Sequence, residues 1–124
     1  MKRDKNLYNT KVMEHFLHPQ NIGIIENATN VATAGNSEDG DVIRLFLLIQ
    51  EGVIIDAKVK VLGCPVAIAS ADILAEMLKG KTIMEALRIK NEDISEALGG
   101  LPPQKLKCSV FAETLINSAL KGKK

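Results

Sequence analysis

The sequence is poor in aromatic residues, with one Tyr, three Phe and no Trp. Surfaces that bind single-stranded nucleic acid use exposed rings on which bases stack, so this composition disfavours that class of protein. Sixteen Lys and Arg against fifteen Asp and Glu leave a formal net charge of only +1. Such a charge gives no large positive field to attract nucleic acid. We therefore expect no nucleic-acid partner.

Long apolar runs are also missing. No run approaches the roughly 20 residues that span a bilayer, and no apolar signal core follows the charged amino terminus, residues 1–5. Apolar residues still make up 46% of the chain, which is enough for the core of one domain. We expect a single cytoplasmic domain over residues 1–124, with no membrane partner and with a frayed tail at 121–124.

The chain has only two cysteines, Cys64 and Cys108. They are too few for the disulfide framework of a small secreted protein, and their spacing matches no zinc ribbon or zinc finger. Each stands where the pattern predicts a helix start, and the positive end of the helix dipole favours the thiolate form of a cysteine there. Free cysteines are also common in protein cores. The residues alone leave inert packing and chemistry as about equal alternatives.

Alternating apolar residues predict two strands, Asp41–Gln50 and Val53–Leu62, joined by the tight turn of an antiparallel hairpin. The first is apolar on nearly both faces, which favours a central position in the sheet. In the second strand, the odd-numbered residues from 53 to 61 are expected on the buried face. The polar stretch 21–40 is predicted to be a long loop with a short edge strand near 30–33.

Helical spacing and capping signals predict the remaining elements. Thr82 and Glu85 match a capping box, and Pro65 suits a first helical position. Together with the hairpin, the helices predict an α+β domain, a small antiparallel sheet packed with helices. The expected helices cover residues 7–17, 65–79, 82–89, 91–99 and 108–120.

Three short stretches at the ends of predicted elements carry the candidate chemistry: Asp39-Gly40-Asp41, Gly63-Cys64-Pro65 and Lys107-Cys108-Ser109. Asp and Gly are also ordinary turn residues, so the first stretch has a structural explanation as well. We interpret His15 and His18 as a helix-surface residue and a helix-terminal residue rather than as metal ligands.

Motifs along nearly the whole chain resemble one family, the scaffold proteins of iron–sulfur cluster assembly (IscU and the amino-terminal domain of NifU). The resemblance implies a sheet of three antiparallel strands covered by helices. It also implies a scaffold or carrier rather than an enzyme, which accepts sulfur from a cysteine desulfurase and passes a labile [2Fe–2S] cluster to acceptor apo-proteins. The motifs are His18-Pro19-Gln20-Asn21-Ile22-Gly23, Gly40-Asp41-Val42, Gly63-Cys64 before Ala67-Ile68-Ala69-Ser70, Leu101-Pro102-Pro103-Gln104-Lys105, and Lys107-Cys108-Ser109.

The same resemblance implies that Cys64, Cys108 and Asp41 are ligands and that Cys108 accepts the persulfide sulfur. Two residues depart from the family pattern: Asp39 replaces a ligand cysteine and Lys107 replaces a histidine. A carboxylate matches iron–sulfur clusters less well than a thiolate does, so the cluster is expected to be labile. Lys107 would instead stabilise a neighbouring thiolate. The expected metal ligands are Asp39, Asp41, Cys64 and Cys108, and zinc is a possible occupant in purified protein.

The segment Leu101, Pro102, Pro103, Gln104 and Lys105 resembles the site at which a dedicated chaperone binds these scaffolds. The family has valine where this chain has Gln104, which argues against chaperone binding. The two lost ligands leave an alternative function open, a zinc-binding or metal-free adaptor that docks on the assembly machinery. A redox thiol enzyme is a weaker alternative because no C-x-x-C motif is present. The expected oligomeric state is a monomer or a weak homodimer.

Overall fold

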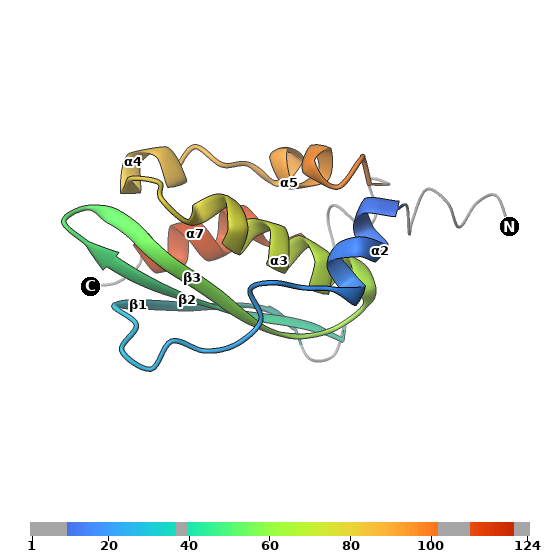
Figure 1. Cartoon of the computed structure of the whole chain (residues 1–124), viewed down its shortest axis with the longest axis horizontal. Coiled ribbons are helices and arrows are strands. Elements are labelled where there is room, and N and C mark those ends of the chain that lie inside the picture. Colours follow the sequence, from blue (N-terminus) through green and yellow to red (C-terminus); the bar gives the residue numbers. More distant parts are fainter. Residues whose placement is uncertain (1–9, 37–39, 102–109, 121–124) are drawn as a thin grey trace, which may run out of the picture.

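A computed structural model describes residues 10–36, 40–101 and 110–120. A three-stranded sheet in the order β1-β2-β3 carries helices on one face (Figure 1). All strand pairs are antiparallel, and the predicted α+β architecture is confirmed. The elements are α2 (Thr10–Leu17), β1 (Asn30–Asn36), β2 (Asp41–Gln50), β3 (Val53–Leu62), α3 (Pro65–Leu78), α4 (Ile83–Ala86), α5 (Asn91–Ala97) and α7 (Ala112–Leu120).

The predicted hairpin forms with β2 as the central strand. Its two turn residues, Glu51 and Gly52, have φ angles of 53° and 81°. Two successive positive φ values are typical of the tight turn whose twist matches that of the flanking strands. The bounds of both strands agree with the alternation in the sequence.

A β-bulge changes the buried face of β3 near the turn. Leu48 pairs with Asp56 and the next residue, Ile49, pairs with Ile54, so Ile55 has no partner in the ladder. The extra residue reverses the alternation. Ile54 is fully buried and Ile55 is 46% exposed. The expectation that Ile55 lies on the buried face was therefore wrong.

Strand β1 is longer than the predicted edge strand. It runs over seven residues and pairs with β2 along its whole length. Ala32 and Ala34 are buried beneath the helices, whereas Val31 and Thr33 are exposed. Small residues, Asn and Gly are weak strand formers. Pairing with the strongly apolar β2 is what extends this strand.

The helices cover the inner face of the sheet, with α3 packed on β3 and α7 on β1 (Figure 1). The expected capping box of Thr82 and Glu85 is present at α4. The large side chains of the core that are completely or almost completely buried are Ile43, Leu45, Leu47, Ile54, Leu74, Leu78, Ile94, Leu98, Leu115, Ile116, Val12 and Val59.

The helices predicted over 82–89 and 108–120 are both shorter in the structure, and the last helix starts four residues late. It begins at Ala112 rather than at Cys108, and Val110 and Phe111 precede it in non-helical conformation. The side chain of Asn91 accepts a hydrogen bond from the backbone N–H of Glu113 (3.0 Å), so a residue of α5 caps this helix. The helical spacing of the sequence also predicts a buried Thr114, and this prediction is wrong, because Thr114 is exposed.

Two further expectations lie wholly or partly beyond the described residues. The helix predicted from residue 7 is described from Thr10 onward, and the tail 121–124 lies outside. Among the described helices, none combines the length and the apolar character that a membrane-spanning segment requires.

Candidate metal and sulfur site

Two of the predicted site residues, Asp41 and Cys64, lie together at one end of the sheet. Asp41 begins β2, and Cys64 lies between the end of β3 and the start of α3. The backbone N–H of Cys64 donates to Oδ1 of Asp41 (3.0 Å), and Sγ of Cys64 lies 3.9 Å from Oδ2. The antiparallel register, in which Val42 faces Leu62, brings these two positions close in space.

The carboxylate of Asp41 serves as the cap of α3. Cys64 occupies the N-cap position with extended backbone angles (φ −77°, ψ 170°), but its own side chain makes no capping hydrogen bond. Pro65 follows at the first helical position, where its missing N–H costs nothing. Asp41 thus supplies the negative charge and the acceptor that a helix start favours.

Two glycines leave room for Asp41. A Cβ atom on Gly63 would lie 2.3 Å from Oδ1 of Asp41, and one on Gly35 would lie 2.1 Å from its carbonyl oxygen. Neither contact is possible for a real side chain without a shift of Asp41. We did not predict either steric role, because the spacing of residues along the sequence does not show where two strands approach closely. Gly63 does belong to one of the family motifs.

The distance between the two donor atoms suits a shared metal ion. A thiolate at about 2.3 Å and a carboxylate oxygen at about 2.1 Å from a tetrahedral ion lie about 3.6 Å apart. The observed separation of 3.9 Å between Sγ of Cys64 and Oδ2 of Asp41 is close to this value. Asp41 is 7% exposed and Cys64 is half-buried, so solvent has limited access to the pair.

The pair is not a complete metal site by itself. Within residues 10–36, 40–101 and 110–120, no three His, Cys, Asp or Glu side chains are arranged to hold a metal ion. The predicted ligands Asp39 and Cys108 lie outside these ranges, together with Lys107 and residues 102–105. Leu101 is described, and its backbone N–H donates to Oγ of Ser95 (2.9 Å).

A hollow of about 360 Å³ lies on the sheet face that the helices leave uncovered. It begins at Val42 and Leu62, the neighbours of Asp41 and Gly63, and its walls are mainly apolar. Leu62 is 68% exposed. Two basic side chains, Arg44 and Lys60, also line the hollow.

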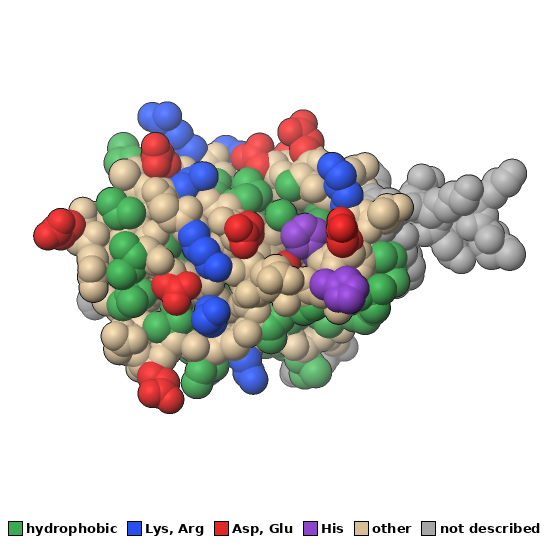
Figure 2. All heavy atoms as spheres, in the orientation of Figure 1, with side chains coloured by type: hydrophobic (Ala, Val, Ile, Leu, Met, Phe, Trp, Pro, Cys, Tyr) green, Lys and Arg blue, Asp and Glu red, His purple; other side chains and the backbone are tan. Residues whose placement is uncertain are grey.

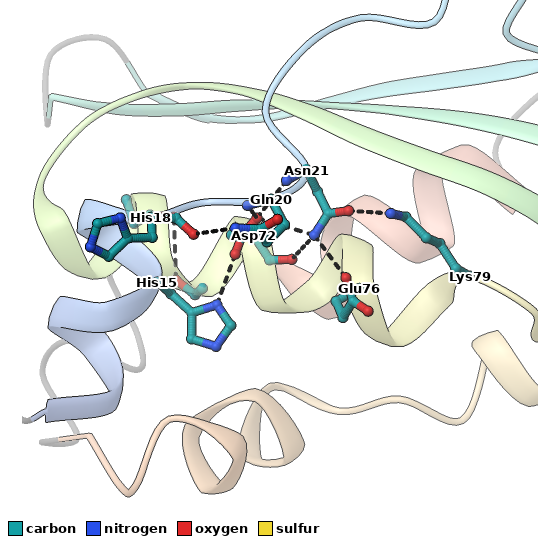
Figure 3. A network of polar contacts seen from close by, with 9 residues as sticks. His15, His18, Gln20, Asn21, Asp72, Glu76 and Lys79 are labelled. Carbon is teal, nitrogen blue, oxygen red and sulfur yellow. Dashed lines mark hydrogen bonds and ion pairs between the residues drawn. The ribbon is translucent and has the colours of Figure 1, made fainter.

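A buried acid that was not predicted, Asp72, pairs through its carboxylate with Nδ1 of His15 at 2.8 Å (Figure 3). The available signal in the sequence was an acidic residue near the middle of the most apolar predicted helix, residues 65–79. His15 is indeed on a helix surface, but its ring is half-buried against α3 rather than free in solvent.

Comparison with known proteins places these features in a family context. The family model described as NifU-like N terminal domain matches residues 7–123. The scaffold protein IscU 1 of Archaeoglobus fulgidus, named for iron-sulfur cluster assembly, is 43% identical over 114 residues, covering 92% of this chain and 74% of that protein. IscU of Aquifex aeolicus is 42% identical over 116 residues with the same coverage. NifU of Azotobacter chroococcum is 41% identical over 115 residues, which cover 91% of this chain and 37% of that longer protein.

Solved structures share the fold. The amino-terminal part of a nitrogen-fixing NifU-like protein from Brucella abortus gives a TM-score of 0.63 at 21% identity, with 92% of this chain and 81% of that chain covered. A protein of Fervidobacterium islandicum assigned to the SUF system of cluster assembly gives 0.72 at 24% identity, with coverage of 92% and 96%. Together with the family match over residues 7–123, these findings show that the chain belongs to the NifU-like N-terminal domain family.

Proposed function

We propose that the chain is a scaffold or carrier for iron–sulfur cluster assembly, not an enzyme. The observation that carries this proposal is the Asp41–Cys64 pair, with Sγ and Oδ2 3.9 Å apart at the start of α3. Family membership supports it, since several relatives at 41–46% identity are named for iron–sulfur cluster assembly.

The donor set explains how such a cluster is held and released. Cys64 and Cys108 offer soft thiolates, which iron–sulfur clusters prefer, whereas Asp41 and Asp39 offer hard carboxylates. A mixed set binds more weakly than four thiolates do. We expect a labile [2Fe–2S] cluster that passes readily to acceptor apo-proteins, and zinc as a competing ion.

Sulfur reaches the chain by thiol chemistry at Cys108. The thiolate of Cys108 attacks the outer sulfur of a persulfide on a cysteine desulfurase, and the desulfurase thiolate leaves. The outer sulfur then remains on Cys108 as a persulfide, so no external oxidant is needed. Lys107 precedes Cys108 directly in the sequence, and its positive charge would favour the thiolate form of Cys108.

The hollow beside the site is the surface on which we expect the sulfur donor to dock. It joins exposed apolar side chains to two cations, Arg44 and Lys60, on the face opposite the helices. A partner that covers Leu62 also comes close to Gly63 and Cys64, which follow it directly. The segment 101–105 remains a second candidate contact, with Gln104 arguing against the dedicated chaperone.

Anaerobic reconstitution with iron and sulfide tests the ligand assignment. The protein should develop visible charge-transfer absorption, and Cys64→Ala, Cys108→Ala and Asp41→Asn should each lose most of it. Asp56→Asn, which changes a half-buried acid elsewhere on β3, is the matched control and should reconstitute normally. Asp39→Cys should make the cluster persist longer, because a thiolate replaces a carboxylate.

Reconstitution that is unaffected by Cys64→Ala and Asp41→Asn would contradict the proposed ligands. Iron and sulfide analysis combined with native mass gives the cluster type and tells a monomer from a weak homodimer that shares one cluster.

The replacement of two family ligands by Asp39 and Lys107 supports a second candidate function, a zinc-binding or metal-free adaptor that docks on the assembly machinery. Incubation with a cysteine desulfurase and cysteine separates the two. A scaffold gains the mass of one sulfur on the peptide that contains Cys108. An adaptor binds the desulfurase but gains none.

A further inference from the structure

One buried carboxylate fastens the amino-terminal part of the described chain to α3 (Figure 3). Asp72 is completely buried. Its Oδ1 accepts the backbone N–H groups of Gln20 (2.9 Å) and Asn21 (2.8 Å), and its Oδ2 pairs with Nδ1 of His15 (2.8 Å). These partners all belong to residues 15–21, which lie more than fifty positions earlier in the chain.

Asn21 extends the attachment along the same helix. Its side chain is buried, with Nδ2 donating to Oε1 of Glu76 (3.1 Å) and Oδ1 accepting from the ammonium group of Lys79. Its backbone carbonyl accepts the N–H of Val59 (2.9 Å) and so also joins the segment to β3. Residues 15–21 are thus held by a connected set of polar contacts.

Apolar packing of α2 accompanies these polar contacts. The described part of α2 has eight residues, and among these Val12 is the only completely buried side chain, whereas Leu17 is 59% exposed. Short helices in water depend on contacts with the rest of the protein for most of their stability. Loss of the contacts to Asp72 would release several hydrogen bonds together, so α2 and residues 18–21 should detach as a unit rather than residue by residue.

The position of α2 gives this attachment a consequence for the candidate site. Figures 1 and 3 both show α2 beside the turn through which β3 leads into α3, where Cys64 is the N-cap. A hollow of about 400 Å³ lined by Glu14, His15, His18 and Gln20 opens next to the attachment. Figure 2 shows the two histidines on one exposed face, so solvent reaches the outer side of the His15 ring.

We propose that α2 and residues 18–21 form a strap over the Cys64 end of α3, with the His15–Asp72 pair as its latch. The closed strap restricts access to the first turn of α3. The open strap exposes Cys64 to a partner or to incoming iron. The inference rests on the proposed function only in giving Cys64 a role as ligand.

Substitution of the latch histidine tests the strap in the metal-free protein. His15→Phe keeps a flat ring but leaves Oδ2 of Asp72 without its donor. A hydrogen bond to a charged group contributes enough that its loss should raise the opening equilibrium about ten- to hundredfold. Hydrogen exchange of the α2 amides and iodoacetamide labelling of Cys64 should both accelerate, while exchange in β2 stays unchanged.

His18→Phe is the matched control, because His18 is exposed at the end of the same helix. It should change neither rate. Mass analysis of the peptide that contains Cys64 separates its labelling from that of Cys108.

Unchanged exchange in α2 would overturn the latch. Faster exchange in α2 without faster labelling of Cys64 would overturn the strap, leaving a purely structural attachment. If His15→Phe does not fold, Asp72→Asn takes its place, because its amide oxygen still accepts from Gln20 and Asn21. This variant should raise both the exchange rate in α2 and the labelling rate of Cys64. If neither rate rises, the proposal is overturned. Neither measurement involves iron or sulfide. The strap can therefore be contradicted while cluster binding is confirmed, and cluster binding can be contradicted while the strap is confirmed.

Discussion

At the scale of single residues, the candidate site depends on a missing side chain. Gly63 has no Cβ, and this absence lets the carboxylate of Asp41 reach the backbone N–H of Cys64. Its φ angle lies outside the positive range, so alanine is compatible with the backbone, and the contact of 2.3 Å with Oδ1 of Asp41 is the main obstacle to a side chain there. The sequence contains the glycine, but only the fold reveals what it makes room for.

Gly63→Ala should therefore displace Asp41 and weaken metal binding. Overpacking of this kind lowers the free energy of unfolding by about 1–3 kcal/mol, and urea denaturation measures it. Gly80→Ala is the control, because Gly80 has a φ of 85° and open space around it. It should cost about 1–2 kcal/mol through backbone strain while zinc or iron affinity stays unchanged. Equal metal affinity in both variants would contradict the steric role of Gly63.

At the scale of elements, the bulge in β3 decides which of two adjacent isoleucines belongs to the core. Simple alternation puts Ile55 inside, whereas the structure buries Ile54 completely and exposes 46% of Ile55. A bulge adds one residue to one strand, and nothing in the local pattern of apolar residues marks where it occurs.

Ile54→Ala should lower the free energy of unfolding by about 2–5 kcal/mol, because it leaves a cavity in the core. Ile55→Ala, the same change one residue later, should stay within about 1 kcal/mol. Chemical denaturation of the two variants compares them directly. A larger loss for Ile55→Ala would mean that the strand follows the unbroken alternation.

At the scale of the whole molecule, the helices occupy one face of the sheet (Figure 1). The other face has a mainly apolar hollow beside the site. Leu62 on that face and Met84 on α4 are almost equally exposed, at 68% and 67%. Leu62 lies in the sheet layer and Met84 in the helix layer. Substitutions at these two residues therefore compare docking on one side of the molecule with docking on the other.

Leu62→Glu should slow sulfur transfer from a cysteine desulfurase at least about tenfold, because a charge in an apolar contact must be desolvated. Met84→Glu should leave the transfer rate unchanged. Chemical reconstitution with inorganic sulfide needs no docking, so both variants should still bind a cluster. Equal transfer rates for the two variants would rule out docking on this face.

Much of this architecture follows from the sequence by itself. The hairpin, its central strand, the start of α3 at Pro65 and the capping box at Thr82 were all predicted, because side-chain periodicity and capping depend on residues a few positions apart. The resemblance that pointed to the family also needed only the order of the motifs. Within the site, those same motifs predicted Asp41 and Cys64 as ligands.

Only the tertiary structure decided which groups meet. The contact between Asp41 and Cys64 spans 23 positions, the attachment of His15 to Asp72 spans 57, and the cap that Asn91 gives to α7 spans 22. Such contacts depend on the register of the strands and on the packing of the helices. The periodicity of side chains along the sequence contains information about neither. The sequence determined the elements and the side chains that they carry, and packing determined which of those side chains lie close together.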